Sequence, residues 1–392
     1  MKRRDFLKLA GAVSLTGCAT TAAPSKARVV VIGGGFGGAT AAKYLRLWDP
    51  SIDVVLVERD AQFVSCPISN LVLAGYSSMA DITHGYDGLR RHGVQLVRDE
   101  VTAIDAAKKS VRLARGGEIA YERLIVSPGI DFTFGEVQGY DAAMAAGSVL
   151  HAWKAGPQTV ALRQQLERMR DGGVYVLSIP MAPYRCPPGP YERISMVAAY
   201  FKQAKPRSKV LVLDANPDVT SKAGLFKRAW ADLYKDIIEY RPNAKVVAVE
   251  TGAVRTDFDT VKGDVLNVVP PHRAGDIAAK SGLITTNNRW CDVDWRTMES
   301  KAVPGVHVLG DATLSAPGMP KSGSMANNHA KIAAAAIVEL LNGRSPQPVK
   351  IINTCYSFVG EKEAIRVSSV HEWDGSMLQP VKGSGGVSAA RS

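Results

Sequence analysis

Cysteine thiols are the side chains of this chain that suit redox chemistry best. Five cysteines occur among its 392 residues. Four of them lie beyond the N-terminal 23 residues, at Cys66, Cys186, Cys291 and Cys355. No two of these four have the spacing of a CxxC pair or of zinc ligands, so we expect no metal site. In an oxidising compartment, two thiols that are far apart in the sequence can form a disulfide.

A glycine-rich loop near the start of the chain supplies a second chemical feature. The motif GGGFGG at residues 33–38 follows an apolar, β-branched run at residues 28–32 and precedes a helix predicted over residues 39–47. A second strand, predicted over residues 53–57, ends on Glu58. Strand, GxGxxG loop, helix, strand and acid, in this order, predict a dinucleotide-binding βαβ unit.

Each residue type in this loop has a physical role. Gly33 makes the tight turn, Gly35 lets the backbone approach a pyrophosphate, and Gly38 permits close packing of helix on strand. The helix N-terminus supplies amide donors and a positive dipole for the phosphates. We expect Glu58 to accept hydrogen bonds from ribose hydroxyls, and we include its neighbour Arg59 among the cofactor-binding residues.

Two later segments favour FAD over NAD as the dinucleotide at this loop. Residues 121–129, YERLIVSPG, look like the strand and turn that return to the cofactor in FAD-linked disulfide-reductase-like proteins, with Gly129 in the turn. Residues 305–312, GVHVLGDA, look like the second flavin motif of those proteins, in which Gly310 precedes Asp311, the acid expected to bind the ribityl chain.

The segment after this second motif is predicted to complete the flavin site. Residues 321–327 begin with Lys321 and lead into a helix predicted over residues 328–341. The N-terminus of that helix would face the isoalloxazine ring. We therefore include Lys321 among the cofactor-binding residues.

A second βα unit has lost its phosphate cradle. It begins with a strand at residues 173–180, and a later strand at residues 209–213 ends on Asp214. The turn between them reads PMAPYRCPPGP at residues 180–190. Prolines lack the amide donor and have a fixed φ, so this turn cannot form a glycine cradle. We do not expect a nicotinamide dinucleotide to bind here.

Residues 1–23 have the order of a bacterial export signal. The arginine pair at residues 3–4 is followed by a short apolar run at residues 9–15 and by small residues up to position 23, which is typical of the twin-arginine type. We therefore expect a periplasmic protein that is exported already folded. Residues 15–18, LTGC, resemble a lipobox, so lipidation of Cys18 is an alternative to plain cleavage and the one route to a membrane that we expect.

The charge of the chain is strongly basic. Residues 1–23 carry four basic side chains and one acidic side chain, so their removal lowers the formal charge from +11 to +8. A basic surface can steer an acidic protein partner or an anionic substrate. The sequence has neither an aromatic-interleaved basic stripe nor a nucleic-acid motif, so we do not expect a nucleic-acid partner.

Four short motifs resemble one family closely, the flavoprotein subunit of flavocytochrome c sulfide dehydrogenase. They are SCPISN at residues 65–70, PYRCPPGPYER at residues 183–193, WC at residues 290–291 and NTCYS at residues 353–357. The resemblance runs through nearly the whole chain after the leader. It implies an α/β fold with two Rossmann-like βαβ domains, of the glutathione-reductase and sulfide-quinone-reductase type, and a small C-terminal domain.

The domain boundaries follow from the motifs and from this resemblance. We expect an FAD-binding domain over residues 27–140 and 280–342, and a degenerate NAD-binding-like domain over residues 141–279. The C-terminal interface domain would cover residues 343–392. It contains a predicted strand near residues 349–358 and ends in a polar, glycine-rich tail that we expect to be disordered.

The resemblance also implies roles for individual residues. Cys66 matches the cysteine that forms a thioether to the flavin 8α-methyl group, although a small buried thiol would have the same appearance. Cys186 and Cys355 match a redox disulfide beside the flavin, and the alternative is a purely structural disulfide. Glu192 resembles the proposed acid/base of the family, whereas a surface glutamate at a helix start is the alternative. We expect Cys291 to be a buried, inert thiol.

The implied function is oxidation of sulfide by this disulfide and FAD, with electrons passed one at a time to a cytochrome c subunit. The chain contains no CxxCH motif, so the haem must lie on another polypeptide. One alternative is a sulfide:quinone oxidoreductase, which usually has an apolar C-terminal docking region where this chain has a polar tail. A noncatalytic flavin-binding electron carrier or assembly factor is the alternative from another class.

Overall fold

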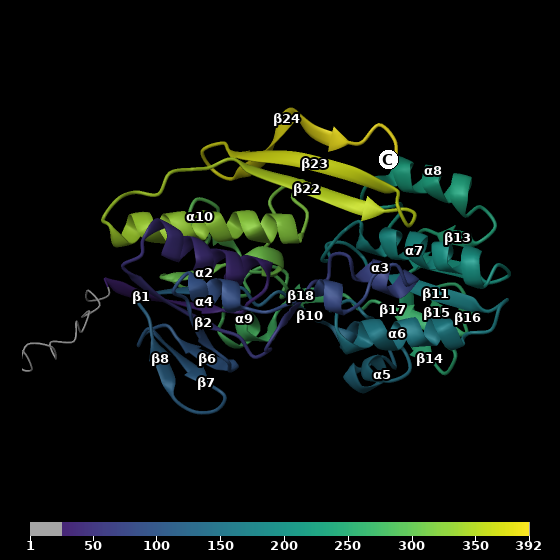
Figure 1. The fold of residues 1–392 in the computed structure, drawn as a ribbon, viewed down its shortest axis with the longest axis horizontal. Coiled ribbons are helices and arrows are strands. Elements are labelled where there is room, and N and C mark those ends of the chain that lie inside the picture. The colour runs from purple at the N-terminus through teal and green to yellow at the C-terminus, as the bar shows by residue number, and fades with distance from the viewer. Residues whose placement is uncertain (1–25, 392) are drawn as a thin grey trace, which may run out of the picture.

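The computed structural model describes residues 26–391 as an α/β protein of three parts (Figure 1). The predicted export signal and Cys18 lie outside the described residues. Within residues 26–391, no helix combines the length and the apolar character that a membrane crossing requires.

The first part contains a seven-stranded sheet in the order β19-β20-β21-β9-β1-β2-β5. Its strands are β1 (Ala27–Ile32), β2 (Ile52–Val57), β5 (Gln95–Val97), β9 (Arg123–Val126), β19 (Val293–Asp294), β20 (Glu299–Ser300) and β21 (Val306–Val308). The five strands from β21 to β5 are parallel. Both faces of a parallel sheet are covered, which is why β1 and β2 are nearly continuous runs of buried Val, Ile and Leu.

Helices α2 (Phe36–Trp48) and α10 (Gly323–Leu341) pack against each other on this first part. The helix predicted over residues 328–341 is α10, which begins at Gly323, five residues earlier than predicted. Ser322 explains the earlier start, because its Oγ accepts a hydrogen bond from the amide of Met325 at 3.1 Å and caps the first turn.

An antiparallel sheet and several short elements complete the first part. The sheet consists of β6 (Val101–Asp105), β7 (Ser110–Leu113) and β8 (Glu118–Ala120). The short elements are β3 (Phe63–Val64), α3 (Ser69–Ala74), η1 (Ala80–Ile82), β4 (Thr83–His84), α4 (Asp87–Arg91), α9 (Asp276–Lys280) and η3 (Gly310–Ala312).

The second part has its own parallel sheet in the order β13-β12-β11-β17. These strands are β11 (Val174–Ile179), β12 (Lys209–Asp214), β13 (Ile238–Arg241) and β17 (Val265–Val268). Its other elements are η2 (Phe134–Glu136), α5 (Ala142–Ala146), α6 (Pro157–Arg168), α7 (Gly189–Ala204), α8 (Ala223–Leu233), β14 (Val246–Glu250), β15 (Ala253–Thr256) and β16 (Thr260–Lys262). The chain joins the two parts through an antiparallel pair, β10 (Ile130–Phe132) with β18 (His272–Ala274).

The third part is an antiparallel sheet of β22 (Ile351–Phe358), β23 (Ala364–Trp373) and β24 (Leu378–Val387). Figure 1 shows it lying across the top of both other parts, and β22 contacts both α10 and α7. The prediction of a disordered tail is wrong for residues 378–387. Pairing with β23 supplies the order that the glycine-rich sequence does not encode locally.

Candidate active site

A cavity of about 1330 Å³ collects residues from all three parts of the molecule. Most of the predicted site residues line it: Gly33, Gly35, Glu58, Arg59, Cys66, Gly129, Cys186, Glu192, Gly310, Asp311 and Cys355. Gly38 and Lys321, which were also predicted, lie behind the wall. Small-molecule pockets commonly measure about 300–1,000 Å³, so this cavity has room for a ligand of dinucleotide size.

The glycine loop has the geometry of a phosphate cradle. Gly33 has a φ of +93°, and a Cβ placed on it would lie 2.4 Å from the carbonyl oxygen of Ser127. A Cβ on Gly38 would lie 1.9 Å from the carbonyl oxygen of Gly33, so this glycine permits the close contact of α2 with β1. A Cβ on Gly35 would meet no atom within 4 Å, because this residue faces the cavity. Two glycines thus serve packing and one leaves room for a ligand.

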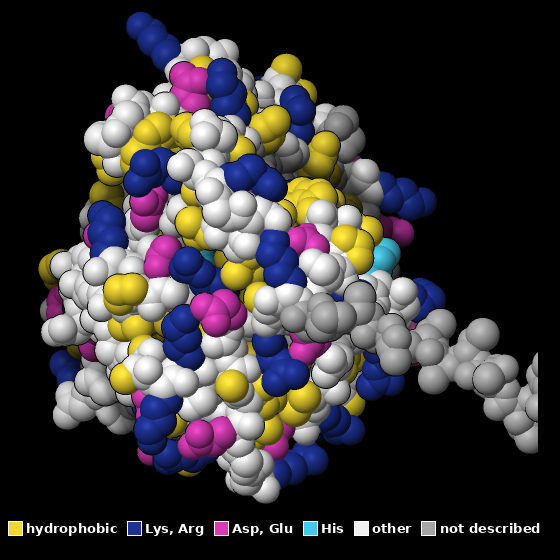
Figure 2. Space-filling view, turned by 90° about the vertical axis from the view of Figure 1, so that its left-hand side faces the viewer, with side chains coloured by type: hydrophobic (Ala, Val, Ile, Leu, Met, Phe, Trp, Pro, Cys, Tyr) yellow, Lys and Arg dark blue, Asp and Glu magenta, His cyan; other side chains and the backbone are white. Residues whose placement is uncertain are grey.

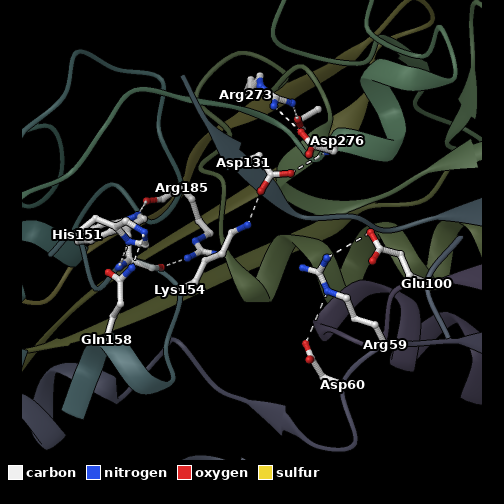
Figure 3. A network of polar contacts seen from close by, with 12 residues as sticks. Arg59, Asp60, Glu100, Asp131, His151, Lys154, Gln158, Arg185, Arg273 and Asp276 are labelled. Carbon is white, nitrogen blue, oxygen red and sulfur yellow. Dashed lines mark hydrogen bonds and ion pairs between the residues drawn. The ribbon is translucent and has the colours of Figure 1, made fainter. Parts of the chain in front are cut away.

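Two charged residues follow β2 at the same end of the cavity. Glu58 Oε2 accepts a hydrogen bond from the amide of Gly34 at 2.6 Å, which ties the carboxylate to the glycine loop. Arg59 lies 3.6 Å from Glu100 and 4.0 Å from Asp60, and Figure 3 shows its guanidinium between these two carboxylates. Its side chain is mostly exposed, so it remains free to turn towards a ligand.

Asp311 provides an unsatisfied acceptor on the cavity wall. Its Oδ1 is buried, and no group among residues 26–391 donates a hydrogen bond to it. Burial raises the pKa of this carboxyl, while Arg185 and Lys321 oppose the shift. A buried, unpaired carboxylate oxygen is costly unless a ligand supplies a donor, as a hydroxyl of a bound ribityl chain would.

Lys321 supports this wall from behind. Its ammonium donates to the carbonyl oxygens of Asp311 and Thr313 and lies 3.6 Å from the ring centroid of Trp290. Burial lowers its pKa to about 8. Its own carbonyl accepts a hydrogen bond from the amide of Cys186 at 2.8 Å. Lys321 does not line the cavity, because its ammonium is held by these backbone groups, and its part in cofactor binding stays a prediction.

Cys66 faces the cavity from the turn that precedes α3. Its Sγ is half-buried and accepts a hydrogen bond from the amide of Ala155 at 3.4 Å. Ile68, two residues later, has a φ of +75°, which is a strained conformation for a β-branched residue. The thiol is free in the structure, so its linkage to a flavin stays a prediction.

Cys186 and Cys355 reach the same cavity from different parts of the chain. Cys186 lies in the turn before α7 and Cys355 lies on β22. Burial, together with the charges of Glu192 and Cys355, raises the pKa of Cys186 to about 12, although Arg185 and Lys222 oppose the shift. Both sulfurs are free thiols in the structure, and their pairing as a redox disulfide stays a prediction.

Glu192 lies on the first turn of α7 and faces the cavity. It is 8% exposed, so the alternative of a surface glutamate at the helix start is wrong. Its carboxylate accepts hydrogen bonds from Asn70 Nδ2 at 2.8 Å and from the amide of Phe358 at 3.0 Å. Burial raises its pKa, although these hydrogen bonds oppose the shift. A carboxyl with a raised pKa is suited to proton transfer.

Basic side chains line the cavity beside the cysteines. Lys154 pairs with Asp131, and Arg185 donates to the carbonyl oxygen of Trp153 (Figure 3). Arg193 is 2% exposed and donates to Asn70 Oδ1 at 3.1 Å. These cations give the region around the cysteines a positive potential that attracts a small anion.

Several of these residues were missed by the sequence analysis. Asn70 and Arg193 belong to the motifs at residues 65–70 and 183–193, so their position beside the cysteines was the available signal. Ser357 lies in the motif at residues 353–357, whereas Lys222 lies in none of the four motifs, and only the fold brings it from the turn before α8 to Ser357 on β22. Cys291 is fully buried, and burial raises its pKa to about 12, as expected for an inert thiol.

In the second βα unit, the acid at the end of the strand is hydrogen-bonded by other protein groups. Asp214 ends β12 and is fully buried. Its Oδ2 accepts from the hydroxyls of Tyr191 at 2.8 Å and Tyr240 at 2.9 Å, and its Oδ1 accepts from Asn216 Nδ2 at 2.7 Å. An acid at this position binds a ribose in a functional dinucleotide site. Its engagement by protein groups favours the prediction that no nicotinamide dinucleotide binds here.

Known proteins resemble this chain over most of its length. The profile of the central domain of the sulfide dehydrogenase [flavocytochrome c] flavoprotein chain matches residues 159–270, and the flavin-binding profile of flavocytochrome c sulphide dehydrogenase matches residues 347–392. The pyridine nucleotide-disulphide oxidoreductase profile matches residues 27–166. The sulfide dehydrogenase [flavocytochrome c] flavoprotein chain of Chlorobaculum thiosulfatiphilum is 69% identical over 45 residues, which are 94% of that sequence and 12% of this chain.

The chain belongs to the flavocytochrome c sulfide dehydrogenase flavoprotein family.

More distant similarity extends to sulfide:quinone oxidoreductases. The mitochondrial sulfide:quinone oxidoreductase of Mus musculus is 26% identical over 335 residues, covering 79% of this chain and 71% of that protein. The sulfide:quinone oxidoreductase structure from Aquifex aeolicus superposes with a TM-score of 0.76 at 19% identity, covering 92% of this chain and 87% of that chain. The predicted α/β fold with two Rossmann-like units is therefore confirmed.

The cavity of this flavoprotein fits FAD. The open position at Gly35 and the N-terminus of α2 suit a pyrophosphate, and Glu58 suits a ribose. The unsatisfied Oδ1 of Asp311 suits a ribityl hydroxyl. These groups lie in one continuous cavity that also contains the three cysteines Cys66, Cys186 and Cys355.

Proposed function

We propose that this chain oxidises sulfide at a disulfide between Cys186 and Cys355, with FAD as its cofactor and a cytochrome c subunit as the onward electron acceptor. One observation carries the proposal. Cys186, Cys355 and Glu192 line the same cavity as the glycine cradle and Asp311. The family supports sulfide oxidation by a flavoprotein, and the cytochrome acceptor is our inference from it.

In the proposed reaction one cysteine sulfur is attacked by the substrate, the other cysteine is the leaving group, and Glu192 is the base. The sulfur of hydrosulfide attacks one cysteine sulfur, the S–S bond breaks, and its electron pair leaves with the other cysteine as a thiolate. The first cysteine then carries a persulfide. Glu192 accepts the proton when the incoming molecule is hydrogen sulfide, and its raised pKa makes it a stronger base than an ordinary glutamate. The cations Arg185 and Lys222 favour the thiolate.

Bound FAD supplies the acceptor for two electrons, whose removal returns the cysteines to the disulfide and releases sulfur at the zero oxidation state with one proton. The chain has no haem-attachment motif, so a cytochrome acceptor would be a second polypeptide. Tyr356 on β22 lines the cavity and is 66% exposed, and its neighbour on the same strand face, Ile352, is 57% exposed. These apolar side chains would give a partner a docking point close to the cavity.

We further propose that FAD is linked to Cys66 and that the protein works in the periplasm. The position of Cys66 on the cavity wall supports the first point, and the twin-arginine sequence supports the second. Acid precipitation tests the linkage: the yellow colour should stay with the wild-type chain and leave the Cys66→Ser chain. Colour lost from both chains would contradict the linkage.

Stopped-flow spectroscopy tests the reaction itself. Micromolar sulfide should bleach the flavin absorbance of the purified protein, and Cys186→Ser and Cys355→Ser should each abolish this fast phase. Cys291→Ser is the matched control, because this buried thiol lies outside the cavity. A noncatalytic carrier would not be bleached quickly, and bleaching that survives in both cavity variants would exclude the disulfide.

A quinone is the second candidate acceptor. The 26% identity to the mouse sulfide:quinone oxidoreductase, over 79% of this chain, favours it. Reoxidation of the sulfide-reduced protein separates the two acceptors. Cytochrome c should reoxidise it rapidly, whereas a soluble quinone should do so slowly. The opposite order would replace the proposed acceptor with a quinone.

A further inference from the structure

A buried lysine lies directly behind the strand that carries Cys355. Lys222 precedes α8, and its side chain is 7% exposed. Its Nζ donates to Ser357 Oγ at 2.8 Å and to the carbonyl oxygen of Cys355 at 3.3 Å. Lys222 does not line the cavity, so it can act on the site only through its neighbours.

Ser357 connects this lysine to Glu192. The Ser357 side chain is 1% exposed and lines the cavity. A lysine ammonium can only donate, and a hydroxyl has one proton, so the proton of Ser357 is directed to another acceptor. Glu192 lies beside this serine: its carboxylate accepts a hydrogen bond at 3.0 Å from the amide of Phe358, the residue that follows Ser357, and the Ser357 hydroxyl helps to lower its pKa. The order of groups is therefore Lys222, Ser357 and Glu192.

The charge of Lys222 has no direct carboxylate partner. Among the described residues, no acidic oxygen lies within 4 Å of its Nζ. Burial lowers its pKa, and Cys355, Glu192 and Cys186 oppose that shift. A buried cation is costly unless nearby groups compensate its charge. The groups that compensate the charge of Lys222 are Cys355, Glu192 and Cys186, which are the catalytic residues of the proposed function.

We propose that Lys222 is a positioning residue that, through Ser357, holds Glu192 as an oriented carboxylate beside the cysteine pair. The inference rests on the proposed function for the role of Glu192 in turnover. The contacts that support it are the 2.8 Å bond from Lys222 to Ser357 and the 3.0 Å bond that Glu192 accepts from the amide of Phe358, the next residue of β22.

Other charged groups face the same region and must be held constant in any test. Arg185 precedes Cys186 and acts on its thiol, as does Lys222. Arg193 follows Glu192 on α7 and interacts with it and with Cys186. None of the hydrogen bonds of Arg185 or Arg193 in the described residues goes to Ser357. Substitution of Lys222 or Ser357 therefore leaves both arginines in place.

Titration of Glu192 tests the inference without turnover. The FAD-loaded protein is labelled with ¹³C at the glutamate carboxyl carbons, and the Glu192 signal is assigned by its loss in Glu192→Gln. In Lys222→Met the pKa of Glu192 should rise by about one unit, because an opposing positive charge is lost. Lys222→Arg should stay near the wild-type value. Lys227→Met is the matched control, since Lys227 lies on α8, five residues after Lys222, is half-exposed and pairs with Asp218.

Ser357→Ala tests the route and keeps the lysine charge. The pKa of Glu192 should rise in this variant too, because the hydroxyl donor is lost. An unchanged pKa in a folded Lys222→Met protein would overturn the inference, and an unchanged pKa in Ser357→Ala would overturn the route through the serine. If Lys222→Met does not fold, Lys222→Gln, which also removes the charge, takes its place. Failure of sulfide to reduce the wild-type protein would refute the proposed function and would leave the titration result unaffected.

Discussion

At the scale of single residues, the surroundings decide what each cysteine can do. Cys291 is fully buried in the core of the first part, where no substrate can reach it. Cys186 has a φ of +58°, a strained backbone for a residue other than glycine, and lies among charged groups on the cavity wall. Strain and charge of this kind are concentrated where proteins hold reactive groups.

The raised pKa of Glu192 predicts a distinctive dependence of stability on pH. Between its ordinary value and its raised value, the folded chain binds more protons than the unfolded chain, so stability should fall as pH rises through this window. The loss should be about 1.4 kcal/mol for each unit of pKa difference. Glu192→Gln should remove this loss, so thermal melting curves of the two proteins should diverge with pH.

The same substitution should slow the reaction with sulfide. Removal of a general base commonly lowers a rate constant by about 10²-fold to 10⁴-fold, and stopped-flow reduction measures it. Glu361→Gln is the control, because Glu361 is exposed and does not line the cavity. Melting curves that stay parallel at every pH, together with an unchanged rate, would show that Glu192 neither titrates in this window nor transfers the proton.

At the scale of elements, the loop between β1 and α2 separates packing from binding. Gly38→Ala should destabilise the protein by about 1–3 kcal/mol, because its Cβ would lie 1.9 Å from the carbonyl oxygen of Gly33. Gly35→Ala should fold normally and lose flavin, because its methyl group would enter the open cradle. Melting temperature and flavin content measure the two effects. Equal effects of the two variants on both quantities would contradict this division.

The C-terminal sheet ties the two Rossmann-like parts together. Leu378 on β24 is 1% exposed and packs in the core of the first part, whereas Ile365 on β23 packs in the core of the second part. Leu378→Ala should cost about 2–5 kcal/mol of stability. Val387→Ala, at a residue of the same strand that is 53% exposed, should cost almost nothing. Chemical denaturation compares them, and equal costs would mean that β24 contributes no packing.

The sequence predicted the elements whose signals are local. The run before the glycine loop, the loop itself and Glu58 have fixed spacings, and the structure has β1, α2 and β2 within one to three residues of the predicted bounds. The strand β24 was missed because Gly383, Gly385 and Gly386 favour disorder locally, and its order comes from pairing with β23. The link from Lys222 to Ser357 spans 135 residues of sequence, and no local pattern indicates it.

At the scale of the whole molecule, no single part makes the site. The first part supplies the glycine cradle and Asp311, the second supplies Cys186 and Glu192, and the third supplies Cys355. Figure 2 shows one end face of the molecule, on which Lys and Arg side chains are interspersed with Asp and Glu and form no single basic patch. A partner would therefore be guided by contacts near the cavity more than by one charged patch on this face.

A partner that docks over β22 should depend on Tyr356. Tyr356→Ala should raise the KM for cytochrome c by about tenfold, since an exposed aromatic anchor often contributes more than 1 kcal/mol to an interface. Phe258→Ala is the control, because Phe258 is 84% exposed and lies beyond the cavity lining. Steady-state reduction of cytochrome c measures both. An equal rise in KM for the two variants would place the docking site elsewhere.

The pairing of Cys186 with Cys355 can be measured most directly by peptide mass spectrometry of the oxidised protein before and after two equivalents of sulfide, with no electron acceptor present, so that the first equivalent reduces the flavin and the second opens the disulfide. We predict a peptide pair linked through these two residues before the addition, and a persulfide on one of them with a free thiol on the other after it. Finding both thiols free in oxidised, active protein, or finding the link unchanged after the second equivalent, when the flavin is already reduced and can no longer restore it, would contradict the account.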